Sequence, residues 1–425
     1  MILLLLCLAA FLLLRVPIAY ALGLSAFAYF LFVRPELIVV LPQRFFAGMD
    51  SYTLIALPLF ILMGQLMNAG GITTRLINLC LLCVGRLRGG LGLVNVVASM
   101  LFGGISGSSA SDTASIGSVL IPQMTQRDYP QEFAAGITVA SSTMGMIIPP
   151  SIPMVIYAVT AQVSVGKLFL GGLVPGLLVG IIQLGLVYWV SLRKRYPVEQ
   201  RRWSPREAAS EVLGSLYVLI MPVFVVGTVV AGIATATESA GLGVLYAAIV
   251  GLFLTRHLTL AAAFDALRES ILTSAKIMMI IALSQVFIWV LAYERVPERI
   301  ATAVAALELA PTIMMLLIAA LILVAGTFID VSPAILLFTP VFLPTVVEAG
   351  VSPVLFGVVL VSGLAVGACT PPVGNCLNVC AAVSGLPIGR IFRGAAPFLL
   401  ANVVVLALII CVPQLVLWIS DWLMD

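Results

Sequence analysis

The chain has 425 residues, of which 62% are hydrophobic and 9% are charged, and its mean hydropathy is +1.20. An ordinary soluble domain carries about 25% charged residues, so this composition excludes that class. Apolar runs of span length recur along the chain, which predicts an all-α polytopic membrane protein with about ten spans in the lipid bilayer. The net charge of +3 does not indicate nucleic-acid binding, because the Lys and Arg residues lie between the apolar runs.

Two apolar segments, 1–14 and 16–33, open the chain and are separated by Arg15 and Pro17. Each is short for a span, so they form either two short spans or one broken span, and we favour two. The first segment lacks the basic region and cleavage site of a signal peptide, so we expect it to remain as a membrane helix. A third span is predicted at 54–67. An amphipathic helix lying in the interface is predicted to follow it.

Residues 103–124, GGISGSSASDTASIGSVLIPQM, are too polar and too rich in glycine for an ordinary span. Seven Ser and Thr residues surround Asp112, and an intramembrane carboxylate indicates a functional site. Arg88 and Arg127 flank the stretch. If both face one side of the membrane, 91–124 is a helical hairpin that enters and leaves on that side, with its tip at 106–115.

A span interrupted by glycine and proline follows the first hairpin, and this order of elements recurs in the second half of the chain. The interruptions expose half-helix ends, as in many transporters. The predicted elements are a broken span at 132–162 interrupted at Gly145 and 149–153, a closing span at 168–192, spans at 213–232, 239–254 and 276–293, a hairpin at 311–347 with its tip at 326–333, a broken span at 354–382 interrupted at 367–375, and a last span at 395–419.

The two halves therefore form a sequence repeat. Gly145 and the Pro149-Pro150 pair recur 222 residues later as Gly367 and the Pro371-Pro372 pair. Placing Asp112 on Asp330 also places Pro122 on Pro340. Each half crosses the membrane five times, an odd number, so the second half is predicted to have inverted topology.

The distribution of basic residues predicts the orientation. The densest basic loop contains Arg193, Lys194, Arg195, Arg201, Arg202 and Arg206. If this loop is cytoplasmic, most Lys and Arg residues lie inside, and both termini are periplasmic. The predicted organisation is scaffold spans at 1–68, an interfacial arm at 69–90, a first transport half at 91–192, a basic linker at 193–212, scaffold spans and arm at 213–310, and a second transport half at 311–419.

The tips and the helix breaks together suggest two sites for a hard cation. Hydroxyl, carboxylate and carbonyl oxygens replace the water shell of a small ion, and no organic cofactor or transition metal is indicated. The first site is centred on Ser108, Ser109 and Asp112 beside Gly145, and the second on Gly326, Asp330 and Ser332 beside Gly367. Alternatively, the hydroxyls mediate helix packing and the two aspartates cap half-helices.

Two other assignments depend on single residues. Asn375 and Asn378 follow the second break, where they either face a polar substrate or bond across a helix interface. The GISG sequence at 104–107 looks like the serine motif of an intramembrane protease, which needs a general base near its serine. His257 is the only histidine and lies in a predicted cytoplasmic turn, so it cannot be that base. We therefore do not expect an enzyme.

Several motifs resemble the large membrane subunit (DctM-like) of tripartite ATP-independent periplasmic (TRAP) transporters. They are the tip sequence above, the PPS break, GTFIDVSPAILLFTPVFLP, GACTPPVGNCLNV and GIATATESAGLGVLYA, and the resemblance covers essentially the whole chain. It implies a secondary transporter of the cytoplasmic (inner) membrane, driven by sodium and moving its transport halves as an elevator. The implied cargo is an organic acid such as a C4-dicarboxylate.

The resemblance also implies partners and site residues. A separate small four-helix membrane subunit (DctQ-like) and a periplasmic substrate-binding protein (DctP-like) would complete the transporter. The implied residues are Ser106, Ser108, Ser109, Asp112, Gly145 and Pro149 for sodium site 1; Gly326, Asp330, Ser332, Gly367, Thr370 and Pro371 for sodium site 2; and Ser111, Thr143, Thr370 and Asn375 for the substrate.

Two alternatives remain open from the sequence. A self-sufficient sodium/dicarboxylate symporter with related inverted repeats would need no binding protein. A membrane enzyme or assembly subunit would show no ion-coupled flux.

Overall fold

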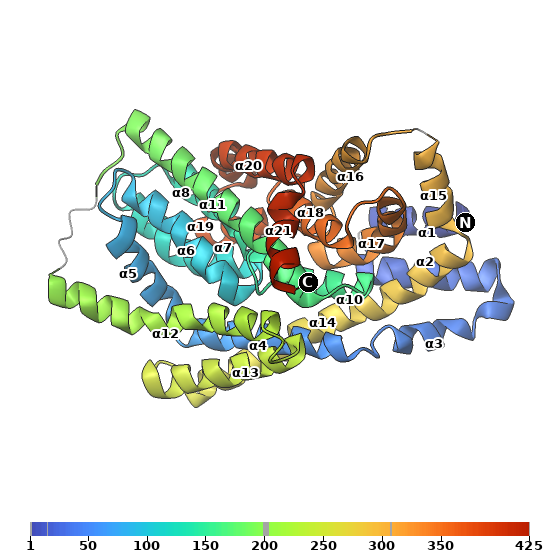
Figure 1. Ribbon diagram of the computed structural model, residues 1–425, viewed down its shortest axis with the longest axis horizontal. Coiled ribbons are helices and arrows are strands. Elements are labelled where there is room, and N and C mark those ends of the chain that lie inside the picture. The colour runs from blue at the N-terminus through green and yellow to red at the C-terminus, as the bar shows by residue number, and fades with distance from the viewer. Residues whose placement is uncertain (1, 15, 199–203, 307, 425) are drawn as a thin grey trace.

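The structure is a computed structural model that describes residues 2–14, 16–198, 204–306 and 308–424. These residues form helices and no strand, apart from an isolated bridge between Arg88 and Val198, which confirms the all-α prediction. Most helices run along the longest axis of an elongated body (Figure 1). Within the described ranges, eight helices are long and apolar enough to cross a membrane.

The first half of the chain forms a row of helices followed by a hairpin and an interrupted span. The row consists of α1 (Ile2–Leu13), α2 (Ile18–Phe32), η1 (Pro35–Leu37), α3 (Val40–Ala47), η2 (Tyr52–Ile55), α4 (Ala56–Ala69) and α5 (Ile72–Val84). The hairpin is α6 (Gly90–Ser106) and α7 (Ser109–Thr125); the interrupted span is α8 (Gln131–Ser142), α9 (Met144–Ile147) and α10 (Ile152–Ala161); and α11 (Val165–Lys194) closes the half.

The second half has the same order of elements. It begins with α12 (Pro205–Val230), α13 (Ala236–Ile249), the π-helical turn η3 (Val250–Leu254), α14 (Leu260–Tyr293) and α15 (Val296–Ala305). The second hairpin is α16 (Pro311–Gly326) and α17 (Val331–Glu348), the interrupted span is α18 (Pro353–Gly367) and α19 (Asn375–Ser384), and α20 (Ile388–Cys411) and α21 (Gln414–Met424) end it. Both hairpins and both interruptions were predicted.

The structure corrects several predicted boundaries. The last span ends at Cys411, because Pro413 cannot continue the helix, and α21 follows as a separate helix instead of a span to 419. Helix α14 begins at Leu260, sixteen residues before the predicted start at 276. The prediction missed this part of the helix because charged residues in it interrupt the apolar pattern. At the start of the chain, α1 and α2 pack on each other as two helices, so they are not one broken span.

Two helices extend into the predicted basic linker at 193–212. Helix α11 continues to Lys194 and α12 begins at Pro205. Arg15, Arg201 and Arg202, which contributed to the predicted charge bias, lie outside the described residues.

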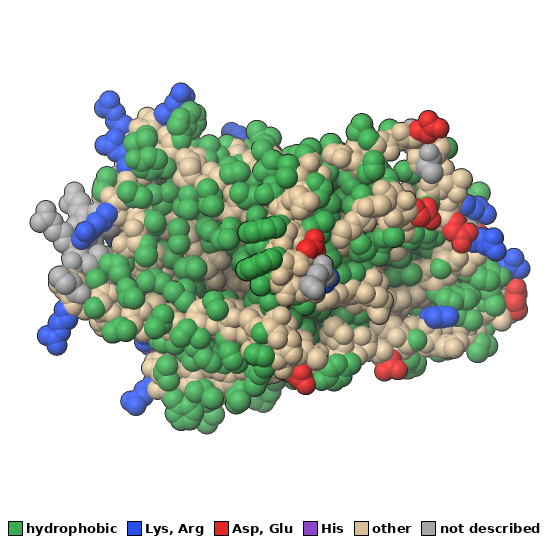
Figure 2. Space-filling view, viewed as in Figure 1, with side chains coloured by type: hydrophobic (Ala, Val, Ile, Leu, Met, Phe, Trp, Pro, Cys, Tyr) green, Lys and Arg blue, Asp and Glu red, His purple; other side chains and the backbone are tan. Residues whose placement is uncertain are grey.

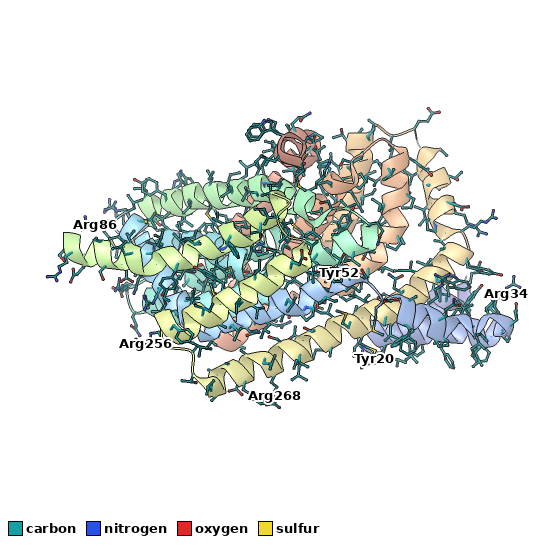
Figure 3. The ribbon with its side chains drawn as sticks, turned by 60° about the horizontal axis from the view of Figure 1, so that its bottom comes forward. Tyr20, Arg34, Tyr52, Arg86, Arg256 and Arg268 are labelled. Carbon is teal, nitrogen blue, oxygen red and sulfur yellow. The ribbon has the colours of Figure 1, made fainter. Side chains whose placement is uncertain are left out.

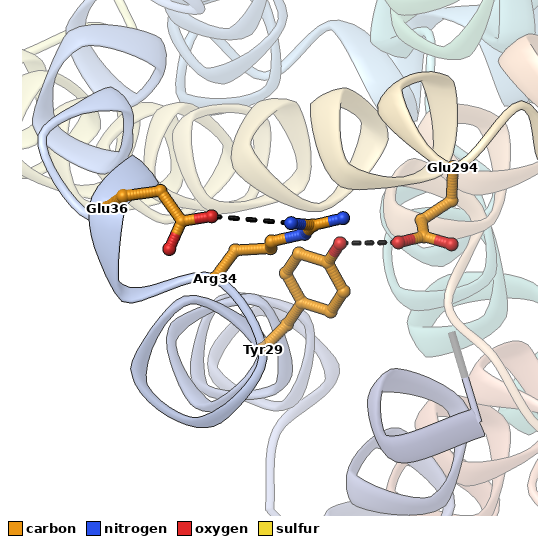
Figure 4. Close-up of polar contacts among 4 residues, drawn as sticks. All are labelled: Tyr29, Arg34, Glu36 and Glu294. Atoms are coloured by element: carbon orange, nitrogen blue, oxygen red, sulfur yellow. Dashed lines mark hydrogen bonds and ion pairs between the residues drawn. The ribbon is translucent and has the colours of Figure 1, made fainter.

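Helices α4 and α14 pack side by side along one edge of the molecule, with α13 against α4 and α2 against α14 (Figure 1). A polar contact fixes the end of α14 to α2: the Tyr29 hydroxyl donates to the carboxylate of Glu294, beside the Arg34–Glu36 ion pair (Figure 4). Residue Glu294 directly precedes the turn into α15. The contact therefore holds the corner between a long membrane helix and the short helix that follows it.

Helices α8 and α20 pack closely together and join the two halves of the chain. Gly136 and Gly394 face each other, and a Cβ on Gly394 would overlap the Glu132 carbonyl. At the beginning of the same pair, the Arg390 guanidinium contacts the Glu132 carboxylate at 2.7 Å. Small residues allow this backbone approach, which supplies the dispersion contacts that replace the hydrophobic effect in lipid.

The α8–α20 contact predicts the effect of adding one methyl group. Gly394→Ala is expected to lower the free energy of unfolding by about 2 kcal/mol, because the two helices must separate. Thermal unfolding of the purified protein measures this. Gly389→Ala on the same helix is the control, since nothing lies within 4 Å of its Cβ. Equal melting temperatures for the two variants would contradict the assigned packing.

Candidate functional site

The tip of the first hairpin is joined to the first helix break by backbone contacts. Gly107 adopts a positive φ of 62°, and a Cβ there would lie 3.0 Å from the Pro150 carbonyl oxygen. The Ile152 amide donates to the Gly107 carbonyl at 3.3 Å. The Ser106 hydroxyl contacts the backbone of Ser108 across the turn. These contacts hold the start of α7 against the break between α9 and α10.

Asp112 lies in the first turn of α7 and is fully buried, with 0% of its surface exposed. Neither carboxylate oxygen has a hydrogen-bond partner in the described part of the chain, and the same is true of the Ser109 hydroxyl. Gly145 of α9 lies directly against them. A Cβ on Gly145 would be 3.4 Å from Asp112 Oδ2 and 3.3 Å from the Ser108 carbonyl oxygen.

This arrangement needs a positive partner or a proton. An isolated ionised carboxylate in an apolar medium costs tens of kcal/mol, so a buried carboxylate is paired, bound to a cation or neutral. The Asp112 carboxylate and the Ser108 carbonyl oxygen both lie against Gly145, and Ser109 in the same turn of α7 has a buried hydroxyl without a partner in the described residues. Oxygen donors with one negative charge fit a small hard cation such as Na⁺.

At the second tip a hairpin and a helix break also meet, but the aspartate of this tip is exposed. A Cβ on Gly367 would lie 2.7 Å from the Gly326 backbone, so the second hairpin also meets its break through two glycines. Asp330 is exposed, and Asn375 Nδ2 lies 3.5 Å from its Oδ1. A cavity of ≈ 320 Å³ adjoins this tip, lined by Gly326, Thr327, Phe328, Ile329, Asp330, Ala368, Val373, Gly374 and Asn375. The two tips therefore differ in access.

The helix boundaries also correct the predicted match between the aspartates. Ser108 is the residue that precedes α7, and Asp330 is the residue that precedes α17. These positions are 222 apart, the same offset as Gly145 and Gly367. Placing Asp112 on Asp330 was therefore wrong, because Asp112 lies inside its helix and Asp330 lies at the N-cap. Both Pro-Pro bonds at the breaks are cis.

A small cavity of ≈ 140 Å³ lies between the two tips. Its lining includes the N-terminal ends of four helices, α7, α10, α17 and α19, and one turn of α14. The lining residues are Gly107, Ser108, Ala110, Met146, Ile152, Pro153, Thr273, Ile277, Asp330, Val331, Ser332, Ala368, Asn375 and Cys376. No Lys or Arg is among them. A carboxylate in this cavity would therefore be attracted by helix N-termini rather than by a basic side chain.

Only some of the remaining predicted site residues line this cavity. Ser332 and Asn375 line it. The Thr370 hydroxyl in the break donates to the Val366 carbonyl in the last turn of α18 at 2.8 Å, and Pro371 follows it. Thr143 is fully buried and bonded to α20, so the structure does not bring it to the cavity. Two more predicted residues, Ser111 and Pro149, belong to the first half of the chain.

Ser111 follows the lining residue Ala110 on α7 and is half-buried. The Pro149 carbonyl oxygen would lie 3.2 Å from a Cβ on Gly104 of α6, so it faces the first hairpin. Sequence analysis missed Thr273 and Ile277, because they belong to α14 and reach the cavity only through tertiary packing. No local pattern distinguishes them from other residues of that helix.

Comparison with known proteins places these features in a family. The family model described as "Tripartite ATP-independent periplasmic transporter, DctM component" matches residues 5–415. The C4-dicarboxylate TRAP transporter large permease protein DctM of Pseudomonas aeruginosa is 39% identical, covering 95% of this chain and 94% of its own. The 2,3-diketo-L-gulonate TRAP transporter large permease protein YiaN of Escherichia coli is 32% identical, covering 98% of both chains. The sialic acid TRAP transporter large permease protein SiaM of Vibrio cholerae is 35% identical over 95% of each.

Solved structures show the same fold at low identity. The YdaH transporter of Alcanivorax borkumensis has a TM-score of 0.64 at 14% identity, covering 91% of this chain and 90% of its own. MtrF of Neisseria gonorrhoeae has a TM-score of 0.63 at 15% identity, covering 89% and 84%. The family match, by contrast, extends over nearly the whole chain. This multi-span membrane protein therefore belongs to the DctM family, the large permease components of tripartite ATP-independent periplasmic transporters, which is a family of transporters rather than enzymes.

Proposed function

We propose that this chain is the permease subunit of a sodium-coupled importer of a small organic acid. The observation that carries the proposal is the fully buried Asp112, whose carboxylate oxygens have no donor in the described residues, next to a cavity ringed by helix N-termini. The printed names of the relatives fit this class of cargo, since C4-dicarboxylate, 2,3-diketo-L-gulonate and sialic acid are all organic acids. Because the three acids differ, they do not identify the acid carried here.

In this proposal Na⁺ binds at the first tip between Asp112, the Ser109 hydroxyl and the Ser108 carbonyl. A second Na⁺ binds at the open tip near Asp330, with Gly326 and Gly367 bringing hairpin and break together. Each ion neutralises a carboxylate next to the central cavity. The ions thereby lower the repulsion that the substrate carboxylate would meet there.

The substrate carboxylate then lies at the helix N-termini of the central cavity. Ser108 and Asp330 precede α7 and α17, and neither side chain bonds to the amides of the helix that follows. The first amides of these two helices remain available to an anion, whereas in α19 the Cys376 amide already donates to the Ala368 carbonyl. Because the lining contains no basic side chain, sodium supplies the full positive charge, which makes substrate binding depend on sodium.

The distribution of charge supports the proposed orientation. Figure 2 shows mostly hydrophobic side chains along the body, with Lys and Arg at the end where α11 stops and α12 begins, and a mixture of basic and acidic side chains at the opposite end. In Figure 3, Arg86 and Arg256 lie toward the first end and Arg34 lies at the opposite end. Placing the end that shows only basic side chains in Figure 2 in the cytoplasm puts the N-terminus, which lies at the opposite end in Figure 1, on the periplasmic side. The hairpins and broken helices would then move as an elevator past α4 and α14.

The proposal includes a separate small membrane subunit and a periplasmic binding protein, as the family name implies. The exposed apolar side chains of α12, of the turn after it and of η3, including Leu213, Val223, Ile233 and Phe253, suit contact with lipid or with a second membrane subunit. A self-sufficient sodium/dicarboxylate symporter remains the second candidate, because its fold would place the same hairpins around the same cavity.

Replacing Asp112 tests the ion site. Asp112→Asn is expected to abolish the sodium-specific rise in melting temperature, measured against K⁺ at equal ionic strength. The variant should not be less stable than the wild type without sodium, because it removes an uncompensated buried charge. Asp265→Asn, at an exposed position on α14, is the matched control. A sodium response that survives in Asp112→Asn would refute the assignment of site 1.

Reconstitution tests the partner requirement. Vesicles with an inward sodium gradient are expected to accumulate the organic acid only when the chain is combined with its small subunit and the loaded binding protein. Uptake should fall at least tenfold when either is omitted. Sodium-driven uptake by the chain alone would favour the self-sufficient symporter.

A further inference from the structure

The first interrupted span contains an additional interruption before its Pro-Pro pair. Helix α8 ends at Ser142 and α9 begins at Met144, and Thr143 between them keeps helical backbone angles, but its amide is directed to the Ser141 carbonyl instead of the Val139 carbonyl one turn back. The regular hydrogen bonding of the helix is therefore interrupted at this one residue, two residues before Gly145, which lies against Asp112. Carbonyls near such an interruption need other donors, because an unpaired polar group inside a membrane protein costs several kcal/mol.

The local Ser142 and Thr143 hydroxyls donate to the Val139 and Ala140 carbonyls, each at 2.8 Å, and side chains from three distant segments add further donors. Gln183 Nε2 of α11 donates to the Ala140 carbonyl at 3.0 Å, and Asn402 Nδ2 of α20 donates to the same oxygen at 3.2 Å. The Cys369 thiol of the second break donates to the Val139 carbonyl at 3.4 Å. The end of α8 is thus held by both closing spans and by the opposite break.

The two amides also bond to each other. Gln183 Nε2 donates to Asn402 Oδ1 at 2.8 Å, and Asn402 Nδ2 donates to Thr143 Oγ1 at 3.0 Å. Gln183 is fully buried and Asn402 is 3% exposed. Two buried amides converge on one carbonyl here, whereas the α8–α20 contact nearer the start of both helices is made by Gly136 and Gly394.

We propose that Gln183 and Asn402 are positioning residues for sodium site 1. They set the position and direction of the chain that leads from Ala140 to Gly145, and Gly145 in turn sets the room around the Asp112 carboxylate. They do not touch the ion. The inference rests on the proposed sodium function of Asp112 and adds that ion affinity depends on contacts to both closing spans.

The test measures the sodium concentration that gives half of the maximal thermal stabilisation of the full chain, with K⁺ replacing Na⁺. Gln183→Met and Asn402→Leu keep the approximate side-chain size and remove the donors. Each is expected to raise the half-saturating sodium concentration about threefold to tenfold, the range that corresponds to one lost hydrogen bond. The double variant should shift it little further than the larger single variant, because the two amides act as one unit.

A matched control separates positioning from a general loss of stability. Ser239→Ala in α13 removes buried hydrogen bonds to the Val225 carbonyl and the Thr228 hydroxyl, both at 2.8 Å, away from the ion site. It is expected to lower the melting temperature without changing the half-saturating sodium concentration. If Gln183→Met does not fold, Asn402→Ser provides the same measurement with a smaller change.

The outcomes distinguish the two proposals. A sodium-specific rise in the wild type with unchanged half-saturation in the Gln183 and Asn402 variants overturns the positioning role and leaves the sodium function intact. An equal shift in Ser239→Ala overturns it as well. Absence of any sodium-specific rise in the wild type overturns the sodium function, and the positioning role with it.

Discussion

The burial of one carboxyl group without a hydrogen-bond donor among the described residues governs this structure. Asp112 lies in the first turn of α7 with no exposed surface, against Gly145 of α9. In such a medium a lone carboxylate is unstable by far more than the whole free energy of folding, so the site must bind a cation or a proton. The glycines at 103, 107 and 145 permit the close backbone approach that buries it. The hairpin and the break therefore form one unit around this residue.

The second tip is built from the same parts and lies in different surroundings. Gly326 and Gly367 bring hairpin and break together, but Asp330 stands at the start of its helix and is exposed. One closed site and one open site on either side of a small cavity form an asymmetric pair. In a sodium-coupled cycle, such an asymmetry would let the two ions bind at different stages.

Contacts between the two halves of the chain connect the hairpins with the helix breaks. Helices α8 and α20 meet at Gly136 and Gly394, and Gln183 and Asn402 meet at the end of α8. Helices α7 and α19 pack together, as do α10 and α17, so each hairpin contacts the half-helix of the other half. A displacement of one hairpin would therefore be transmitted to the opposite break. This is the mechanical connection that a shared central site requires.

The sequence by itself determined the element types and indicated where the hairpin tips and the helix breaks lie. Apolar run lengths gave the membrane helices, and the glycine, proline and hydroxyl pattern gave both hairpins and both breaks, because these residues dictate local backbone geometry. Tertiary structure alone decided that Asp112 is closed off while Asp330 is open, that Thr143 bonds to Asn402, and that Thr273 reaches the central cavity. These facts depend on which helices meet across hundreds of residues. The local sequence pattern does not show which distant helices will pack together.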